Sequence, residues 1–343
     1  MLYIYIMTYI DSLLDKLKKK RPTLSNGSIT TYKRNLIQLH KKMFDGNGGI
    51  ESLDFLKDKE KVFDAIKDMK PSSQKLILTT MCVFLNADDD KTNDAVCKDY
   101  RKEVLKIQTE MSNKNVGQHK TDKEKDNWVS WARLEKVRRH YRTQITNKSF
   151  MKTKTASTIS NADFNLLQMW VVASLYTLHP PIRNNYIMTV IDEDDYKKIS
   201  KSDQANTNYL VVKNKKEKYF VLNSYKTVAI HGQKIIPLEK MLNSVINIWL
   251  KFNDSGFLLL NIRKEELTNN GLTKLIQKTF APTGKDNISV NMLRKIYLTD
   301  KYGDEKGEKE KDADAMMHSV KTQQTKYVKY DEDEKDDGND SDK

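Results

Sequence analysis

The 343-residue chain contains few cysteines, glycines and prolines. Two cysteines, Cys82 and Cys97, are too few for a disulfide-stapled scaffold or a four-thiolate zinc site. The 12 glycines and 6 prolines exclude collagen-like architecture, and a hydrophobic content of 38% excludes complete disorder. Such sparse cysteine usage predicts a reducing, intracellular compartment.

The sequence also lacks a long hydrophobic run. The apolar residues 1–10 are interrupted by Asp11 and have neither a basic flank nor a small-residue cleavage site, so neither a signal peptide nor a membrane span is predicted. There is no phosphate-cradling glycine loop, no His-Glu-x-x-His and no Gly-x-Ser-x-Gly. The six histidines have no ligand spacing, so no metal site is predicted.

Positive charge is in excess over most of the chain. Lys and Arg number 60 against 47 Asp and Glu, a formal net charge of +13. The last thirteen residues hold eight acids and two lysines, which leaves +19 on residues 1–330. A cationic body favours a polyanion, usually nucleic acid, because each neutralised phosphate releases counterions. A lysine-rich, solvated surface is the alternative explanation of the same charge.

Periodicity divides the chain into two domains with a linker and a tail. Residues 1–115 are predicted to be all-helical, with helices at 8–20, 27–44, 72–87 and 94–112. Ser25 or Ser28 is expected to cap the second of these. Hydrophobic periodicity is lost over 113–126, and residues 116–126 are taken as an exposed linker. The acidic residues 331–343 are predicted to be a disordered tail.

The second predicted domain covers residues 127–330 and is mixed. Three short β-rich runs predict a small antiparallel sheet at about 208–238. The predicted fold class is mainly α: a helical domain followed by a mixed α/β, mostly helical domain. Its helices are predicted at 127–145, 160–178, 239–252, 268–281 and 289–300, with a charged loop at 301–313.

Four strings in the second domain suit the handling of a phosphodiester. Arg183 follows a long apolar helix and a Pro-Pro break, and an arginine can donate two parallel N–H bonds to phosphate oxygens. Lys226 lies at the end of a predicted strand, and Arg294 lies on a predicted helix in Asn-Met-Leu-Arg. His318 precedes Tyr327 by nine residues, across a spacer rich in Thr and Gln.

In this order and at these separations, the four strings resemble the tyrosine recombinase (phage-type integrase) family over most of residues 127–330. The resemblance implies a SAM-like, core-binding four-helix domain at the N-terminus. It also implies a catalytic set, which here is Arg183, Lys226, Asn291, Arg294, His318 and Tyr327. Asn291 stands where the family usually has histidine, and Met317 stands where it usually has glycine. An amide can donate a hydrogen bond but cannot carry charge or shuttle a proton.

The resemblance implies that Tyr327 attacks a DNA phosphate and forms a 3′-phosphotyrosyl link. Arg183 and Arg294 would stabilise the charge on the phosphate, with hydrogen bonds from His318 and Asn291, and Lys226 would protonate the leaving 5′ oxygen. No metal, ATP or other cofactor is expected, because the covalent link conserves the energy of the phosphodiester. Tyr330 is a competing nucleophile, but it lacks the nine-residue spacing to His318.

The predicted function is therefore site-specific recombination or integration, with double-stranded DNA as partner and a homotetramer assembled on two DNA sites. A type IB topoisomerase and a catalytically impaired DNA-binding relative are the alternatives. The protein is expected to act in the cytoplasm or nucleus of a host, and its composition suits a mobile element or a virus. Candidate DNA contacts are Lys18, Lys19, Lys20, Arg21, Lys33, Arg34, Arg138 and Arg139.

Overall fold

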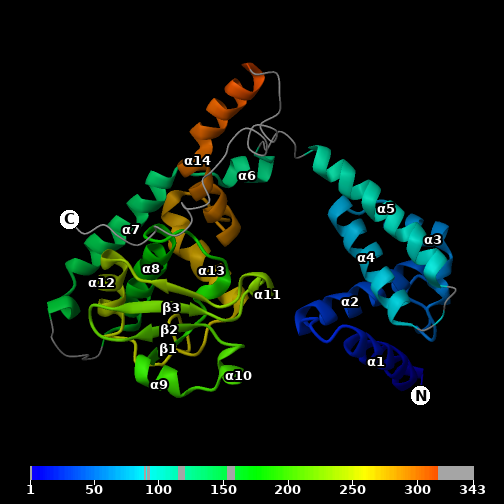
Figure 1. The fold of residues 1–343 in the computed structure, drawn as a ribbon, viewed down its shortest axis with the longest axis horizontal. Coiled ribbons are helices and arrows are strands. Elements are labelled where there is room, and N and C mark those ends of the chain that lie inside the picture. Colours follow the sequence, from blue (N-terminus) through cyan, green and yellow to red (C-terminus); the bar gives the residue numbers. More distant parts are fainter. Residues whose placement is uncertain (1, 89, 91–92, 115–119, 153–158, 316–343) are drawn as a thin grey trace, which may run out of the picture. The chain divides into compact units, whose positions relative to one another are not determined.

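The computed structural model describes residues 2–88, 90, 93–114, 120–152 and 159–315. The chain divides into two compact units, Met1–His119 and Lys120–Lys343. Figure 1 shows helices throughout the first unit and a small sheet surrounded by helices in the second. No helix among the described residues is long and apolar enough to span a membrane.

The first unit is built around helix α4. Its helices are α1 (Leu2–Lys20), α2 (Asn26–Met43), α3 (Lys59–Ile66), α4 (Pro71–Ala87) and α5 (Asn93–Lys114). Pro71 occupies the first turn of α4, where its missing N–H costs no helical hydrogen bond. From Ile77 onward most of α4 is buried, because α1, α2 and α5 pack around it.

Two local predictions for the first unit have clear outcomes. Ser25 caps α2, since its side chain accepts a hydrogen bond from the Ser28 amide at 3.2 Å, so the first of the two proposed caps is confirmed. The four-helix prediction was wrong for the described residues, because it omitted α3, whose eight residues are too short to show a strong period. Cys82 and Cys97 are buried free thiols on α4 and α5, and burial raises the pKa of each.

Helix α8 is the centre of the second unit. This helix, Asn161–Thr177, is buried over most of its length and packs against α7 (Trp131–Thr146), α12 (Lys240–Trp249) and α13 (Asn269–Phe280). Ser160 caps it by accepting a hydrogen bond from the Asp163 amide at 3.1 Å. The other α-helices in the described part of this unit are α6 (Asp122–Asn127), α9 (Glu193–Lys198), α10 (Lys201–Gln204), α11 (Val228–His231) and α14 (Val290–Ala315).

The sheet separates the main core from a smaller one. Among the described residues it has four strands in the order β1 (Thr189–Asp192), β2 (Tyr209–Val212), β3 (Lys218–Leu222) and β4 (Lys234–Pro237). Leu210 and Phe220 face the main core, whereas the neighbouring Val211 and Val221 belong to a second cluster with Tyr196 of α9. This alternation is the period of two expected of a strand with both faces covered. Figure 1 shows α9 and α10 along one side of the sheet.

Two predictions for this part of the chain were wrong, and a third was incomplete. The three strands predicted over about 208–238 are present and antiparallel, but the sheet as a whole is mixed, because a fourth strand, β1, pairs in parallel with β2. The predicted linker contains α6, which begins with a capping box between Thr121 and Glu124. The predicted charged loop at 301–313 is helical, since α14 continues to Ala315; Lys and Glu are good helix formers even without an apolar face.

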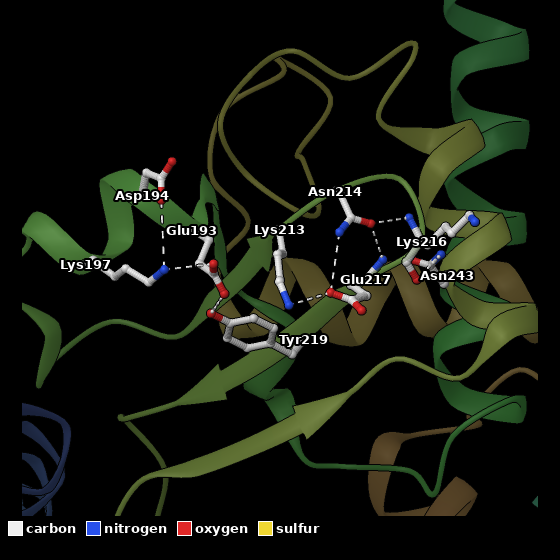
Figure 2. A network of polar contacts seen from close by, with 9 residues as sticks. All are labelled: Glu193, Asp194, Lys197, Lys213, Asn214, Lys216, Glu217, Tyr219 and Asn243. Atoms are coloured by element: carbon white, nitrogen blue, oxygen red, sulfur yellow. Dashed lines mark hydrogen bonds and ion pairs between the residues drawn. The ribbon is translucent and has the colours of Figure 1, made fainter. Parts of the chain in front are cut away.

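A dense polar network holds the turn between β2 and β3. The Asn214 side-chain oxygen accepts hydrogen bonds from the amides of Lys216 and Glu217 at 2.7 and 2.9 Å, and Glu217 pairs with Lys213 at 2.7 Å (Figure 2). Asn243 on α12 donates to the Lys216 carbonyl at 3.1 Å, which joins the turn to the helix. The network fixes the turn at one end of β3, opposite the end that leads to Lys226.

Candidate active site

Three of the residues predicted from the sequence line one cavity. Arg183, Lys226 and Asn291 all border a cavity of about 640 Å³ in the second unit. Arg183 precedes the short 3-10 helix Asn184–Tyr186, Lys226 lies between β3 and α11, and Asn291 is in the first turn of α14. Residues more than a hundred positions apart in the chain therefore meet at one place.

The fold positions Arg183 through the tyrosines behind it. Tyr176 on α8 donates its hydroxyl to the Arg183 carbonyl at 3.3 Å, and the buried Tyr186 donates to the Leu175 carbonyl at 2.9 Å. The rings of Tyr176 and Tyr186 meet edge to face at 5.0 Å. Burial raises the pKa of both phenols well above the ordinary value, so they act as neutral donors that anchor the segment. Arg183 itself is exposed.

The cavity wall is polar. Only Ile187 and Val290 contribute apolar side chains, and Glu266 is the one acidic residue among those that line the cavity. The remaining lining residues are Asn184, Asn185, Asn206, Thr207, Asn208, Ser224, Asn269, Thr273 and Ser289. Sequence reasoning missed this set, because asparagine and threonine are so frequent in turns and at caps that single positions carry no signal.

Two helices begin at the cavity. Thr268 caps α13 by accepting a hydrogen bond from the Gly271 amide at 3.1 Å, and Asn269 and Thr273 on its first turns line the cavity. Ser289 accepts from the Met292 amide at 3.3 Å at the start of α14, where Val290 and Asn291 line the cavity. The positive ends of the two helix dipoles therefore add to the charges of the lining cations.

Neither cation of the cavity is neutralised by the part of the chain that the structure describes. Among the described residues, Arg183 and Lys226 form no ion pair at 4.0 Å or less, although Glu266 lines the same cavity. Both side chains are exposed, so no buried acid fixes their direction. Two uncompensated cations and two helix N-termini on a polar concave wall make a suitable site for a phosphate-type anion.

The structure does not place the complete predicted set in this cavity. Arg294 is half-buried on α14, one turn beyond Asn291, and does not belong to the lining. It shares the same helix face, because residues three apart are neighbours on a helix. His318 and Tyr327, and the competing Tyr330, lie outside the described residues.

A smaller cavity of about 300 Å³ adjoins the first and shares Ser289 and Asn291 with it. Its wall includes Glu124 of α6 and Lys295 of α14, which form an ion pair. Lys295, together with the Thr121 amide, lowers the pKa of the Glu124 carboxyl to about 2. This pair ties the start of the second unit to the helix that carries Asn291 and Arg294.

The candidate DNA contacts in the first unit are mostly exposed. Lys18, Lys19 and Lys20 form the last turn of α1, where cations also stabilise the helix dipole. Lys20 donates to the Asn86 carbonyl at 3.2 Å, and Lys33 is paired with Asp11 at 2.7 Å. The prediction also included Arg21 and Arg34, and the structure leaves both side chains exposed.

The two arginines of α7 differ in exposure. Arg139 is exposed and lies 3.5 Å from the Glu135 carboxylate. Arg138 is only 8% exposed, burial lowers the pKa of its guanidinium, and its Nε is buried without a hydrogen-bond partner in the described part of the chain. The apolar face of α7 carries Arg138 inward, so the structure does not offer this residue as a surface contact for DNA.

The described residues contain no group of three or more His, Cys, Asp or Glu side chains arranged to hold a metal ion. The chain matches none of the protein-family models, curated proteins or solved structures with which it was compared.

Proposed function

We propose that the protein is a site-specific DNA recombinase or integrase that cuts and rejoins strands through a covalent tyrosine intermediate. The observation that carries the proposal is the convergence of Arg183, Lys226 and Asn291 on one polar cavity. These residues come from three separate strings of the sequence, and the resemblance to the tyrosine recombinase family implies that they share one catalytic site.

The chemistry requires a cationic site for the scissile phosphate. Arg183 binds the nonbridging oxygens and, with Arg294, stabilises the charge that grows on them in the transition state. The Asn291 amide donates a hydrogen bond but supplies no charge. The beginnings of α13 and α14 add fixed dipoles that need no reorganisation during the reaction.

The covalent step balances without a cofactor. The Tyr327 phenol oxygen forms a bond to phosphorus and releases its proton to solvent, while the bond from phosphorus to the 5′ oxygen breaks. Lys226 donates a proton to that 5′ oxygen, which leaves as a hydroxyl. A 5′ hydroxyl of the partner strand then attacks the phosphotyrosine and restores the phenol. The phosphodiester count is conserved, so the reaction consumes no ATP.

The test is covalent capture on a denaturing gel. The full chain is incubated with a nicked suicide duplex that carries the sequence flanking its own gene, in the presence of a chelator. The expected result is a protein–DNA band that is retained in Tyr330→Phe and absent in Tyr327→Phe. Persistence of the band in Tyr327→Phe, or its absence from the wild type across many duplexes, would overturn the proposal.

One observation favours a second candidate, a DNA-binding relative with impaired cleavage. Asn291 faces the cavity at the place where the resemblance expects histidine. Asn291→His distinguishes the candidates. An impaired relative should gain covalent capture from this substitution, whereas an active recombinase should already show capture with asparagine. Relaxation of a supercoiled plasmid that carries no chosen site would instead favour a type IB topoisomerase.

A further inference from the structure

A buried asparagine holds the turn that leads to Lys226. Asn208 is 7% exposed and directly precedes β2. Its side-chain oxygen accepts hydrogen bonds from the amides of Asn223 and Ser224 at 3.0 and 2.8 Å, and its Nδ2 donates to the Ser224 carbonyl at 3.0 Å. Asn223 and Ser224 lie just beyond Leu222, the last residue of β3, where the strand no longer pairs with β2. The Asn208 side chain thus replaces the strand ladder at Asn223 and Ser224, three and two residues before Lys226.

The pattern of partners requires an amide at this position. The two backbone N–H groups can only donate and the carbonyl can only accept, so the side chain at position 208 must present an oxygen to the N–H groups and an N–H to the carbonyl. Aspartate would keep the two accepted bonds but would place a carboxylate oxygen against the Ser224 carbonyl. Alanine would leave the three backbone groups without this partner.

The same arrangement joins the Arg183 segment to the Lys226 turn. Asn185, two residues after Arg183, donates to the Ser224 carbonyl at 3.2 Å, so Ser224 is held from two sides. The Asn208 carbonyl in turn accepts from the Thr189 amide at 3.0 Å, at the start of β1. The segments that carry the two cavity cations therefore meet at the backbone of Ser224.

A second contact fixes the far side of the turn. The Tyr225 hydroxyl donates to the Gly232 carbonyl at 2.5 Å, and the Val228 amide donates to the Tyr225 carbonyl at 3.1 Å. Lys226 lies between these contacts and the Ser224 anchor. Its backbone is held on both sides, while its exposed side chain is left to reach into the cavity.

We infer that Asn208 is a positioning residue, which sets Lys226 against the scissile phosphate through the backbone of Asn223 and Ser224. The inference rests on the proposed function and assigns a role to a residue outside the predicted catalytic set. Asn208 acts through Lys226, so its loss should specifically impair protonation of the leaving 5′ oxygen.

The test replaces the leaving group. The suicide duplex described above is prepared in two forms, with an ordinary phosphodiester or with a 5′-bridging sulfur at the scissile position. A thiolate leaves without a general acid, because a thiol is far more acidic than an alcohol. A residue that acts through the general acid therefore shows a defect with oxygen that is repaired with sulfur.

The expected result is a matched pattern for two variants. Asn208→Ala should slow covalent capture on the oxygen duplex on the order of a hundredfold, the scale of a misplaced catalytic group. On the sulfur duplex it should return close to the wild-type rate, as Lys226→Ala should. Arg183→Ala should remain slow on both duplexes, because phosphate binding is needed with either leaving group. Asn208→Asp, which retains two of the three bonds, should show a smaller defect with the same repair.

The matched control is an asparagine of similar burial in another turn. Asn253 is 6% exposed and donates to the Phe257 carbonyl at 2.7 Å, away from the cavity wall. Asn253→Ala should show the same ratio of rates on the two duplexes as the wild type. A defect of Asn208→Ala that is equal on both duplexes, or no defect at all, would overturn the inference and leave the proposed function intact. Absence of capture by the wild type on both duplexes would overturn both.

Discussion

Lys218 and Lys226 lie at opposite ends of β3, and their surroundings differ completely. Lys218 is 3% exposed, and its ammonium donates to the carbonyls of Asn214 and Lys215 and to the side-chain oxygens of Asn243 and Asn247 at 2.6–3.3 Å. Lys226 is exposed, lines the candidate active site and forms no ion pair within the described residues.

The difference shows why residue type alone does not identify a binding site. The oxygens around Lys218 are all neutral, so the ammonium is solvated by the protein itself, and burial lowers its pKa. Its donors are satisfied, and no ligand is needed to complete them. At the cavity, the side-chain donors of Lys226 and Arg183 have no acidic partner among the described residues and can bind an external anion. A ligand site is marked by charge that the fold leaves uncompensated.

The largest expected effect on the reaction is that of replacing Lys226. Lys226→Ala should reduce the rate of covalent capture by about a hundredfold to ten-thousandfold, the usual contribution of a general acid. The midpoint of thermal unfolding of this variant should equal that of the wild type, because the Lys226 side chain is exposed. Capture kinetics on the oxygen duplex and a thermal melt measure both quantities. A lower melting midpoint of Lys226→Ala with unchanged capture kinetics would mean that Lys226, like Lys218, serves stability rather than the reaction.

Replacement of Lys218 should have the opposite effect, lowering stability without changing the reaction rate. Lys218→Met keeps the length of the side chain but leaves four oxygen atoms without their donor, and we expect a loss of about 3 kcal/mol in the free energy of unfolding. Capture kinetics should be unchanged well below the melting temperature. Denaturant titration measures the loss. Lys216→Met is the control, since this exposed lysine in the same turn makes its contacts through the backbone (Figure 2). A loss of the same size in the control would show that the turn, rather than the ammonium, is responsible.

Lys295, beside the cavity, is a third kind of lysine, because it is paired with an acid. Lys295 belongs to an ion pair with Glu124, so it should support stability rather than phosphate chemistry. The folded-state pKa of Glu124, about 2, lies below the value of about 4.3 for an unfolded chain. The stabilisation is therefore present above pH 4.3 and is lost as the pH falls toward 2.

This pair predicts a specific pH response. Glu124→Gln should lower the free energy of unfolding at pH 6 and should lose less stability than the wild type between pH 4.5 and pH 2. Urea titrations of both proteins at several pH values measure the slopes. Parallel slopes would mean that the pair contributes nothing to acid sensitivity.

The smallest loss of stability is expected for an exposed ion pair in the turn between β2 and β3. Lys213 and Glu217 lie 2.7 Å apart, but both side chains are at least half exposed. Lys213→Ala should lower the free energy of unfolding less than Lys218→Met or Glu124→Gln, because solvent and salt screen an exposed ion pair. A double-mutant cycle with Glu217→Ala measures the coupling directly. A coupling as large as the loss in Lys218→Met would contradict this prediction.

Most helices could be predicted because their burial follows a period that is visible in the sequence. Helix α8 is an exception, because it is buried on nearly all sides, and its long apolar run predicted it instead of a period. Strand β1 could not be predicted, because its four residues are stabilised by pairing with β2 twenty positions away. The extension of α14 to Ala315 was missed because a charged helix lacks the hydrophobic period on which the prediction depended.

The candidate site divides in the same way. Arg183, Lys226 and Asn291 were named because their strings resemble those of the tyrosine recombinase family, and the resemblance implies that they share one site. Asn208 and Asn185 carried no signal, since their role depends on the backbone of Ser224, which only the fold brings within reach. Arg138 was expected on the surface and is buried, because the apolar face of α7 turns it inward.

By itself, the sequence determined the helical character of the chain and its excess of positive charge, and it supplied the candidate residues for phosphate chemistry. These properties are local, since they depend on composition, period and spacing. The tertiary structure alone decided which cations are compensated, because compensation depends on neighbours that are distant in the chain. It enclosed Lys218 among amide and carbonyl oxygens from α12 and the β2–β3 turn and left Lys226 open to the cavity, although the two residues are of the same type and lie on either side of the body of β3.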